Sequence, residues 1–199
     1  MFVTLEGIDR SGKSTQAALL AQALGPETLL VREPGGTDAG ERIRELLKDP
    51  RLELDPSAEL LLFSAARAQL ANDVIGPARE AGRDVVCDRY IDSTVAYQGV
   101  ARGLGVEFVE DLNSLVIGDR VPDVTVLVRV DVDAAWARGQ QRLAEGADRF
   151  ESEGVEFQRR VAAAYDELAE RHPDRIVVVD GDGTPEEVHA RVLEVVRAR

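Results

Sequence analysis

Residues 2–24 read FVTLEGIDRSGKSTQAALLAQAL, an apolar run followed by a glycine-containing turn and then by a stretch typical of a helix. A short, continuously apolar run predicts a strand buried on both faces, because crossover helices cover both faces of a parallel sheet. Within the turn, residues 7–14 match G-x-x-x-x-G-K-[ST] at every fixed position. Strand, turn and helix follow one another in the order that a phosphate-binding P-loop requires. The stretch therefore predicts an α/β protein with the P-loop NTPase fold.

The rest of the chain repeats the same alternation. Four further β-rich runs lie at residues 28–32, 84–88, 124–130 and 175–180. Helical patterns lie at residues 13–24, 39–47, 57–80, parts of 93–118, 134–143, 156–171 and 185–197. Strands that alternate with helices indicate a parallel sheet. We expect one five-stranded parallel sheet flanked by helices on both faces.

Length and composition limit the class of protein. A chain of 199 residues, 44% hydrophobic and 31% charged, predicts one globular domain. It has no apolar run of 18 residues, and its start lacks the pattern of a signal peptide, so we expect a cytoplasmic protein without a membrane span. The single cysteine, Cys87, lies in an apolar run and is interpreted as a buried strand residue.

The charge of the chain limits its partners. A formal net charge of −13 argues against DNA or RNA, which bind clustered Lys and Arg. Small phosphorylated ligands remain compatible, because they need only a few cations focused in a cleft. Lys13 and Lys48 are the only lysines of the chain, and Lys13 occupies the one P-loop position that requires lysine.

The P-loop predicts a site for ATP and Mg²⁺. Backbone N–H groups and the start of the helix surround the β-phosphate, Lys13 reaches the β and γ oxygens, and the Ser14 hydroxyl ligates Mg²⁺. A glycine-rich turn that binds nothing is the alternative. The expected ATP-binding residues are Gly7, Ile8, Asp9, Arg10, Ser11, Gly12, Lys13, Ser14 and Thr15.

Two charged residues stand at variable positions of this loop. Arg10 is in a place where a guanidinium can neutralise charge on the transferred phosphoryl group, as an arginine finger supplied in cis. A solvated Asp9–Arg10 pair is the other interpretation.

Two more segments follow buried strands. Residues 85–90 read VVCDRY. Since ligands of open α/β sheets bind beyond the carboxyl ends of the strands, Asp88 should face the P-loop and hold Mg²⁺ through a bound water, and Arg89 should bind the phosphate of an acceptor. Asp88 as a helix cap is the alternative. Residues 32–37, REPGGT, follow the second strand, and their glycines permit close backbone approach to a ligand. A turn that binds no ligand is equally consistent with this segment alone.

Phe63 and Arg67 lie four residues apart and so on one face of a helix. A ring beside a guanidinium can stack on a planar base while the arginine donates to a carbonyl oxygen on the edge of that base. Taken alone, however, Phe63 is more often a core residue.

Together these segments resemble one known family. The P-loop with Asp9 and Arg10, residues 32–37, residues 63–67 (FSAAR), residues 88–98 (DRYIDSTVAYQ) and residues 148–151 (DRFE) are similar, in this order and spacing, to the thymidylate kinases. The resemblance covers almost the whole chain, and residues 88–98 are its most discriminating part.

The resemblance implies phosphorylation of dTMP to dTDP by ATP·Mg²⁺ in a homodimer. By matching position, Phe63 would stack on thymine, Arg67 would donate to its O4, and Arg89 would bind the dTMP phosphate. Asp9 would contact the sugar 3′-hydroxyl or the phosphate region. Thr94 and Gln98 would line the base pocket, and Tyr97 would clash with a ribose 2′-hydroxyl.

A lid is expected at about residues 138–154. It contains Arg142 and Arg149, and the resemblance leaves Arg10 and Arg142 as the two candidates for the catalytic arginine; the lack of arginine runs between Arg142 and Asp148 favours Arg10.

Two other functions remain open. The first is another nucleoside monophosphate or deoxynucleoside kinase. The second, a P-loop nucleotide switch, is disfavoured because neither lysine follows an asparagine, as the guanine-binding motif Asn-Lys-x-Asp requires.

Overall fold

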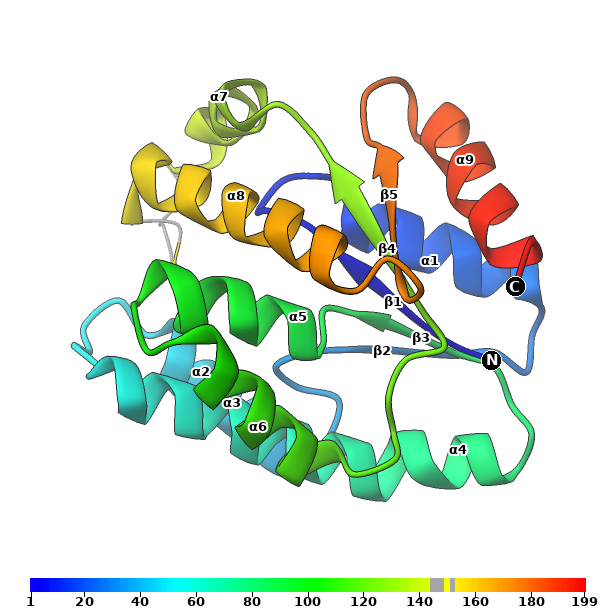
Figure 1. Ribbon diagram of the computed structural model, residues 1–199, viewed down its shortest axis with the longest axis horizontal. Helices are drawn as coiled ribbons and strands as arrows, with labels where there is room; N and C mark the ends of the chain where they lie inside the picture. The colour runs from blue at the N-terminus through cyan, green and yellow to red at the C-terminus, as the bar shows by residue number, and fades with distance from the viewer. Residues whose placement is uncertain (144–148, 151–152) are drawn as a thin grey trace.

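The computed structural model describes residues 1–143, 149–150 and 153–199, with the side chains of 139–143 excepted. Its five strands are all parallel and lie in the order β2-β3-β1-β4-β5 (Figure 1). They are β1 (Phe2–Glu6), β2 (Leu29–Arg32), β3 (Val85–Asp88), β4 (Val124–Arg129) and β5 (Ile176–Asp180). The expected fold is confirmed, and each predicted strand agrees with the observed one to within one residue at either end.

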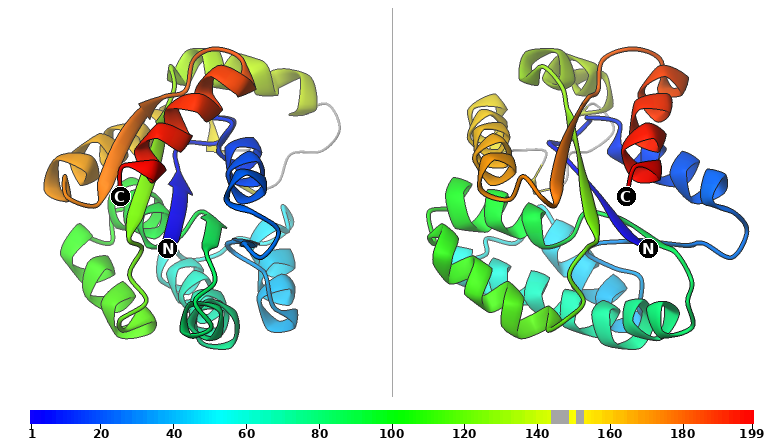
Figure 2. Two further views of the ribbon diagram at one scale, coloured as in Figure 1. Left: turned by 90° about the vertical axis from the view of Figure 1, so that its right-hand side faces the viewer. Right: turned by 45° about the vertical axis from the view of Figure 1, so that its right-hand side comes forward.

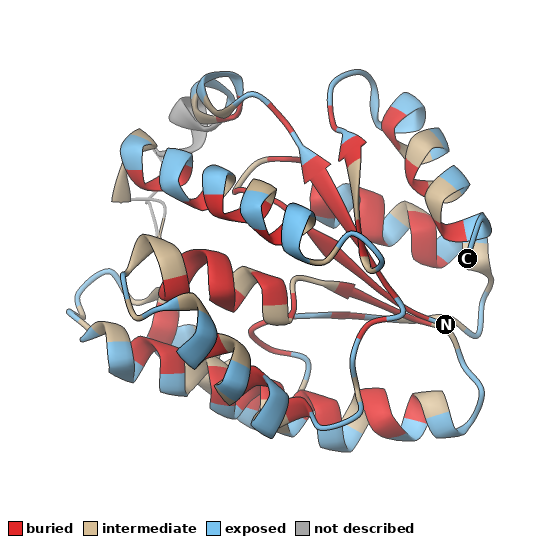
Figure 3. Ribbon diagram, in the orientation of Figure 1, coloured by how far each residue is buried: buried red, intermediate tan, exposed pale blue. Residues whose placement is uncertain are grey.

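Helices cover both faces of the sheet, as predicted. On one face, α1 (Lys13–Leu24) and α9 (Pro185–Arg197) pack against Val3 and Leu5 of β1 and against alternate residues of β4. On the other face lies α8 (Val155–Arg171), and the strands run between α8 and the α1–α9 pair in the right-hand view of Figure 2. Strands β1, β3 and β4 are largely buried, and the edge strands β2 and β5 are partly exposed. The helices turn their exposed sides outward (Figure 3).

The face that carries α8 also carries polar groups. Thr4 and Glu6 alternate with Val3 and Leu5 along β1, so they point away from α1, and both are fully buried. The hydroxyl groups of Thr4 in β1 and Thr125 in β4 form a hydrogen bond of 2.7 Å. Glu6 is the last residue of β1, directly before the P-loop, and therefore lies beneath the edge where a ligand is expected.

The helix predicted for residues 57–80 is present, but its hydrogen-bond pattern changes along its length. It consists of α3 (Pro56–Leu70), a π-helical turn η1 (Ala71–Ile75) and α4 (Gly76–Glu80). Pro77 lacks the N–H that would continue the α-helical hydrogen bonds, which accounts for a change of pattern just before it. The helical path itself continues, so the prediction missed only the type of turn.

The remaining helices surround this frame. Residues 91–117, within which the sequence predicted helical parts, form α5 (Ile91–Thr94), the π-helix η2 (Val95–Ala101) and α6 (Val106–Ile117). Gly103 and Gly105, with φ of +80° and +96°, separate η2 from α6. The others are α2 (Asp38–Lys48) and α7 (Val132–Leu143). No helix within the described ranges is long and apolar enough to cross a membrane.

Candidate active site

The P-loop connects β1 to α1 in a conformation that leaves backbone N–H groups available. Gly7 has a φ of +142°, and a Cβ there would lie 2.6 Å from the Val128 carbonyl oxygen, so only glycine fits. Gly12, at the N-cap of α1, also has a positive φ, and no side chain caps the helix. The first N–H groups of α1 are thus open to an anion.

Lys13 is buried inside this loop. Its Nζ donates to the Ile8 carbonyl oxygen at 3.2 Å and lies 4.0 Å from Asp9 Oδ1. Burial, with the nearby charge of Arg89, lowers the pKa of Lys13 to about 8, although Asp9 and Asp88 oppose the shift. The ammonium group is therefore poorly compensated, and an anion in the loop would stabilise its charged form.

Asp88 and Ser14 meet at the end of β3. The Ser14 hydroxyl donates to Asp88 Oδ2 at 2.5 Å. Asp88 Oδ1 is buried and has no hydrogen-bond partner among the described residues. The N-cap of the following helix is Tyr90, not Asp88, which removes the helix-cap alternative.

Arg89 is held by hydrogen bonds to five groups in the described part of the chain. Its backbone is left-handed, with a φ of +71°, and its guanidinium is mostly buried. Nη2 donates to Asp9 Oδ1 at 2.5 Å and to Tyr97 Oη at 3.2 Å. Nη1 donates to Gly7 O, Ser93 Oγ and Tyr165 Oη. Asp9 is therefore paired with Arg89, which does not fit the solvated Asp9–Arg10 pair considered from the sequence.

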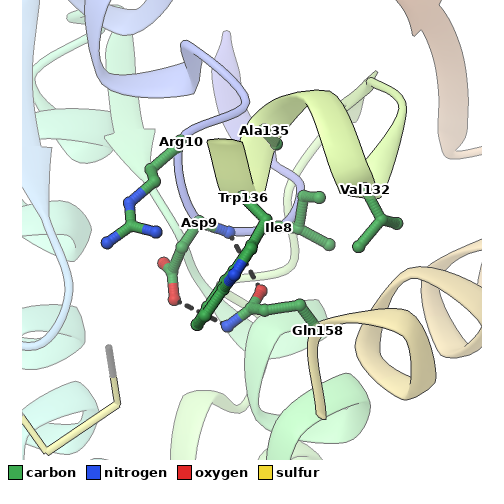
Figure 4. A pocket seen from close by; sticks show the side chains of 7 residues that line it. All are labelled: Ile8, Asp9, Arg10, Val132, Ala135, Trp136 and Gln158. Atoms are coloured by element: carbon green, nitrogen blue, oxygen red, sulfur yellow. Dashed lines mark hydrogen bonds between the residues drawn. The ribbon is translucent and has the colours of Figure 1, made fainter. Parts of the chain in front are cut away.

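Asp9 has a second partner that the sequence did not reveal. Gln158 of α8 accepts from Asp9 N at 3.4 Å and donates from Nε2 to Asp9 Oδ2 at 3.1 Å (Figure 4). Burial opposes ionisation of Asp9, but Arg89, Lys13 and the hydrogen bonds outweigh it and lower its pKa. Gln158 lies 149 residues from Asp9. A single polar residue on an amphipathic helix gives no local signal of such a contact.

Arg10 lies against α7. Its backbone has a φ of +66°, and its guanidinium carbon lies 5.4 Å from the centre of the Trp136 ring. Figure 4 shows Arg10 and Trp136 beside a narrow hollow also lined by Val132 and Gln158. Trp136, like Gln158, was not predicted from the sequence.

A cavity of about 400 Å³ begins at the P-loop and extends between β3 and α3. It contains both lysines of the chain, and its wall is strongly cationic although the chain is acidic. The cations are Arg10, Lys13, Arg32, Arg44, Lys48, Arg67 and Arg89, and the acids are Asp9, Glu33 and Asp88.

The residues expected to bind a base belong to the wall of this cavity. Phe63, Arg67, Thr94, Tyr97 and Gln98 all line it. Phe63 is half-buried rather than a core residue, and its ring meets that of Phe150 edge to face at a centroid distance of 5.7 Å. A partly exposed ring in a polar cavity wall suits a planar base.

Arg67 is buried and makes several hydrogen bonds within the protein that the sequence did not indicate. Its side chain is 1% exposed and pairs with Glu33, with Nη2 2.7 Å from Glu33 Oε2. Nη1 donates to Asn113 Oδ1, and Nη2 also donates to Thr94 Oγ1 and Tyr90 O. Burial raises the pKa of Glu33 to about 7, and Arg67 opposes the rise. Arg67 thus stabilises the cavity wall as well as facing the cavity.

The structure describes the side chain of Arg149 in the expected lid, but not that of Arg142, which lies outside the described residues. Arg149 donates from Nε to Leu47 O, at the end of α2, and pairs with Glu59 Oε2 at 2.6 Å. Glu59 is fully buried and also accepts from Gln98 and Arg102. In this conformation Arg149 therefore contacts α2 and α3.

Comparisons with known proteins agree with this geometry. The family model described as "Thymidylate kinase" matches residues 5–192. A thymidylate kinase of Kosmotoga olearia is 45% identical over 98% of this chain and 94% of its own length. One from a Synechococcus species is 47% identical over 100% and 96%.

A solved structure gives the same answer. The crystal structure of thymidylate kinase from Ehrlichia chaffeensis matches with a TM-score of 0.79 and 37% identity, over 98% of each chain. Its agreement extends the likeness from the motifs to the complete arrangement of strands and helices. Sequence, fold and cavity lead to one conclusion: this chain belongs to the thymidylate kinase family.

Proposed function

We propose that this chain transfers the γ-phosphoryl group of ATP to dTMP and so forms dTDP and ADP. The observation that carries the proposal is the single cavity that joins the P-loop to Arg89 and to the base-binding wall at Phe63. A donor phosphate at Lys13 and an acceptor phosphate at Arg89 would share that cavity. Membership of the thymidylate kinase family supports this assignment, and nothing observed favours a nucleotide switch.

Catalysis in this site would be electrostatic. The phosphate of dTMP is already a nucleophile, so the protein needs to align the two phosphates and neutralise the charge that moves between them. Lys13 would contact the donor phosphate, and Arg89 would hold the acceptor. Arg10, on the P-loop, would neutralise the migrating group, with Arg142 as the alternative source of that charge. Asp9 would orient Arg89 and meet the acceptor sugar or phosphate.

The residues at Ser14 and Asp88 fit a magnesium ion. They offer a hydroxyl oxygen and a buried carboxylate oxygen, Asp88 Oδ1, that lacks a partner among the described residues. Mg²⁺ prefers oxygen ligands, and in kinases it takes few from the protein and the rest from phosphates and water. No cluster of three acidic, His or Cys ligands occurs in the described part of the chain, which agrees with such a shared site. The ion would neutralise phosphate charge.

The base wall would select thymine and deoxyribose. Phe63 would stack on the ring, Arg67 would donate to O4, and Thr94 and Gln98 would complete the pocket. The Tyr97 ring lies 5.0 Å from the Arg89 guanidinium carbon, and in this proposal its hydroxyl would lie near the sugar of dTMP. A ribose 2′-hydroxyl would collide there.

The assembly belongs to the proposal as well. We infer one domain over residues 1–199 with a lid at about 138–154, in a cytoplasmic homodimer. Leu61 of α3 and Phe108 and Leu115 of α6 are 59%, 58% and 82% exposed, on two helices that pack together. Exposed apolar residues on neighbouring helices are typical of a surface that another protein covers. A second copy of the chain is the occupant proposed.

An acceptor panel tests the function. With Mg·ATP, dTMP should yield ADP faster than UMP, dUMP, dCMP or dGMP. Lys13→Ala should abolish turnover with every acceptor, whereas Arg197→Ala, an exposed change at the end of α9, serves as the matched control. Faster turnover of another monophosphate would refute the specificity, and ATP hydrolysis without an acceptor would favour a switch.

A further inference from the structure

Glu6 is a buried carboxylate for which the reaction described so far has no use. It is 0% exposed and is not part of the wall of the large cavity. Burying a carboxylate is costly unless hydrogen bonds compensate it. The four donors around Glu6 therefore indicate what it does.

One oxygen of Glu6 holds the backbone of the segment that carries Arg89. Oε1 accepts from Tyr90 N at 2.7 Å and from Ser93 N at 3.2 Å. These bonds connect the end of β1 to the start of α5. A neutral amide oxygen in the same place could accept both.

The other oxygen of Glu6 faces two hydroxyl groups. Oε2 accepts from Ser93 Oγ at 2.6 Å and from Tyr165 Oη at 2.7 Å. A hydroxyl has one hydrogen, so a hydroxyl that donates to Glu6 can only accept in its other bonds. Glu6 thereby turns the lone pairs of both oxygens away from itself.

Those lone pairs meet Arg89. Its Nη1 donates to Ser93 Oγ at 3.1 Å and to Tyr165 Oη at 3.3 Å. The two acceptors lie on the Nη1 side, and Asp9 and Tyr97 bind the Nη2 side. Arg89 also has a left-handed backbone, which is uncommon for a residue other than glycine and persists where surrounding contacts support it.

We propose that Glu6 is a positioning residue for the acceptor phosphate, because it fixes the direction of the Ser93 and Tyr165 hydroxyls and so holds Arg89 in its binding orientation. The proposal rests on the assignment of Arg89 to the dTMP phosphate. Glu6 does not touch the substrate and acts only through the two hydroxyls.

Glu6→Gln tests this with little change of shape. The amide oxygen can keep the bonds from Tyr90 N and Ser93 N, while the amide NH₂ replaces the acceptor that faces the hydroxyls. Both hydroxyls would then accept from Gln. Because Ser93 Oγ and Tyr165 Oη lie 2.9 Å apart, one hydroxyl would donate to the other, and the remaining hydrogen would turn toward Arg89. We expect the Kd of dTMP to rise about tenfold, the size of one lost hydrogen bond to a charged group.

The readout must separate positioning from mere structure. Measured by calorimetry, the Kd of dTMP should rise in Glu6→Gln. The Kd of ADP and the Kd of thymidine, which lacks the phosphate, should each change by less than about twofold. Tyr165→Phe should weaken dTMP in the same direction but less. The double variant should lose less than the sum of the two, because both changes act on one hydrogen-bonded unit.

Two outcomes would overturn the inference. One is an unchanged dTMP affinity in Glu6→Gln; the other is an equal loss for dTMP, thymidine and ADP, which a general disruption of the fold would give. Arg89→Ala separates the role of Arg89 from the role of Glu6. If it leaves dTMP affinity intact, the assignment of Arg89 fails, whereas a strong effect of Arg89→Ala with none of Glu6→Gln defeats only the role of Glu6.

Discussion

Lys13 is an unusual lysine because its charge is costly before a ligand arrives. With its pKa lowered by burial to about 8, a growing fraction of Lys13 is neutral as the pH rises above that value. If ADP binds only the charged form, the apparent affinity falls in proportion to the charged fraction.

The affinity for ADP should therefore fall about tenfold between about pH 7 and pH 9. Calorimetric titration across this range measures it. Lys13→Arg is the control, since arginine stays charged throughout. It should bind ADP with little dependence on pH in this range, and an equally steep dependence in that variant would assign the effect to another group.

Arg67 is both a base-binding candidate and the counter-charge of Glu33. Removing it by Arg67→Ala leaves a buried acid without its partner, which typically costs about 3–5 kcal/mol. The pKa of Glu33 is already raised by burial above its ordinary 4.5, and loss of Arg67 would raise it further. A proton is then bound in the folded state and not in the unfolded one, so stability falls as the pH rises from about 4.5 through the folded value.

Urea unfolding at several pH values checks this. Arg67→Ala should be least stable relative to the native chain above about pH 7 and should recover toward pH 5. The double variant Arg67→Met with Glu33→Gln removes both charges and should be more stable than Arg67→Ala at neutral pH. A pH-independent loss in Arg67→Ala would contradict the argument.

At the scale of elements, Glu59 ties three segments together. It is a fully buried residue of α3 that accepts from Gln98 and Arg102 of the η2 region and from Arg149. Glu59→Gln would leave two arginines facing a neutral group, and we expect a loss of about 3 kcal/mol. Chemical denaturation measures it. Glu45→Gln, an exposed change on α2, should cost under about 0.5 kcal/mol, and equal costs for the two would mean that the Glu59 contacts contribute little.

The elements also indicate what a sequence can reveal. The inner strands β1, β3 and β4 are largely buried, and each was predictable as a mostly apolar run. The edge strands β2 and β5 are partly exposed, but they are also apolar runs and were predictable for that reason. The π-helical turns were not, because a π-turn differs from an α-turn by one hydrogen-bond step and leaves the apolar periodicity almost intact. The sequence analysis predicted one helix over residues 57–80 and did not use Pro77, before which the hydrogen-bond pattern changes.

At the scale of the whole molecule, the same contrast separates the site residues. Lys13, Ser14 and Asp88 stand at strand ends or in a motif, where the fold itself brings them together. Gln158, Trp136 and Tyr165 come from α7 and α8 and reach the P-loop only through tertiary packing. No local pattern marks them. The sequence therefore predicted the residues of the phosphate-binding loop and strand ends, and missed the residues of α7 and α8 that pack against them.

The exposed apolar residues of α3 and α6 give the prediction on assembly. Leu115→Lys should convert a homodimer into a monomer, because a charge at the centre of an apolar interface loses its hydration. Light scattering gives the mass. Leu30→Lys, on the edge strand β2 and 46% exposed, is the control and should leave the mass unchanged. A native chain that is monomeric at high concentration, or a dimeric Leu115→Lys, would exclude this interface.

Cys87 is the third residue of β3 and lies beside Thr4 of the central strand β1. It is 0% exposed, its Sγ lies 3.0 Å from the Arg89 carbonyl oxygen, and burial raises the pKa of its thiol well above the ordinary value. A thiolate-directed label should therefore react only when the end of β3 opens. The rate at which the single thiol of the native chain is labelled thus reports how often the segment that carries Arg89 opens. This labelling rate should fall when dTMP is bound.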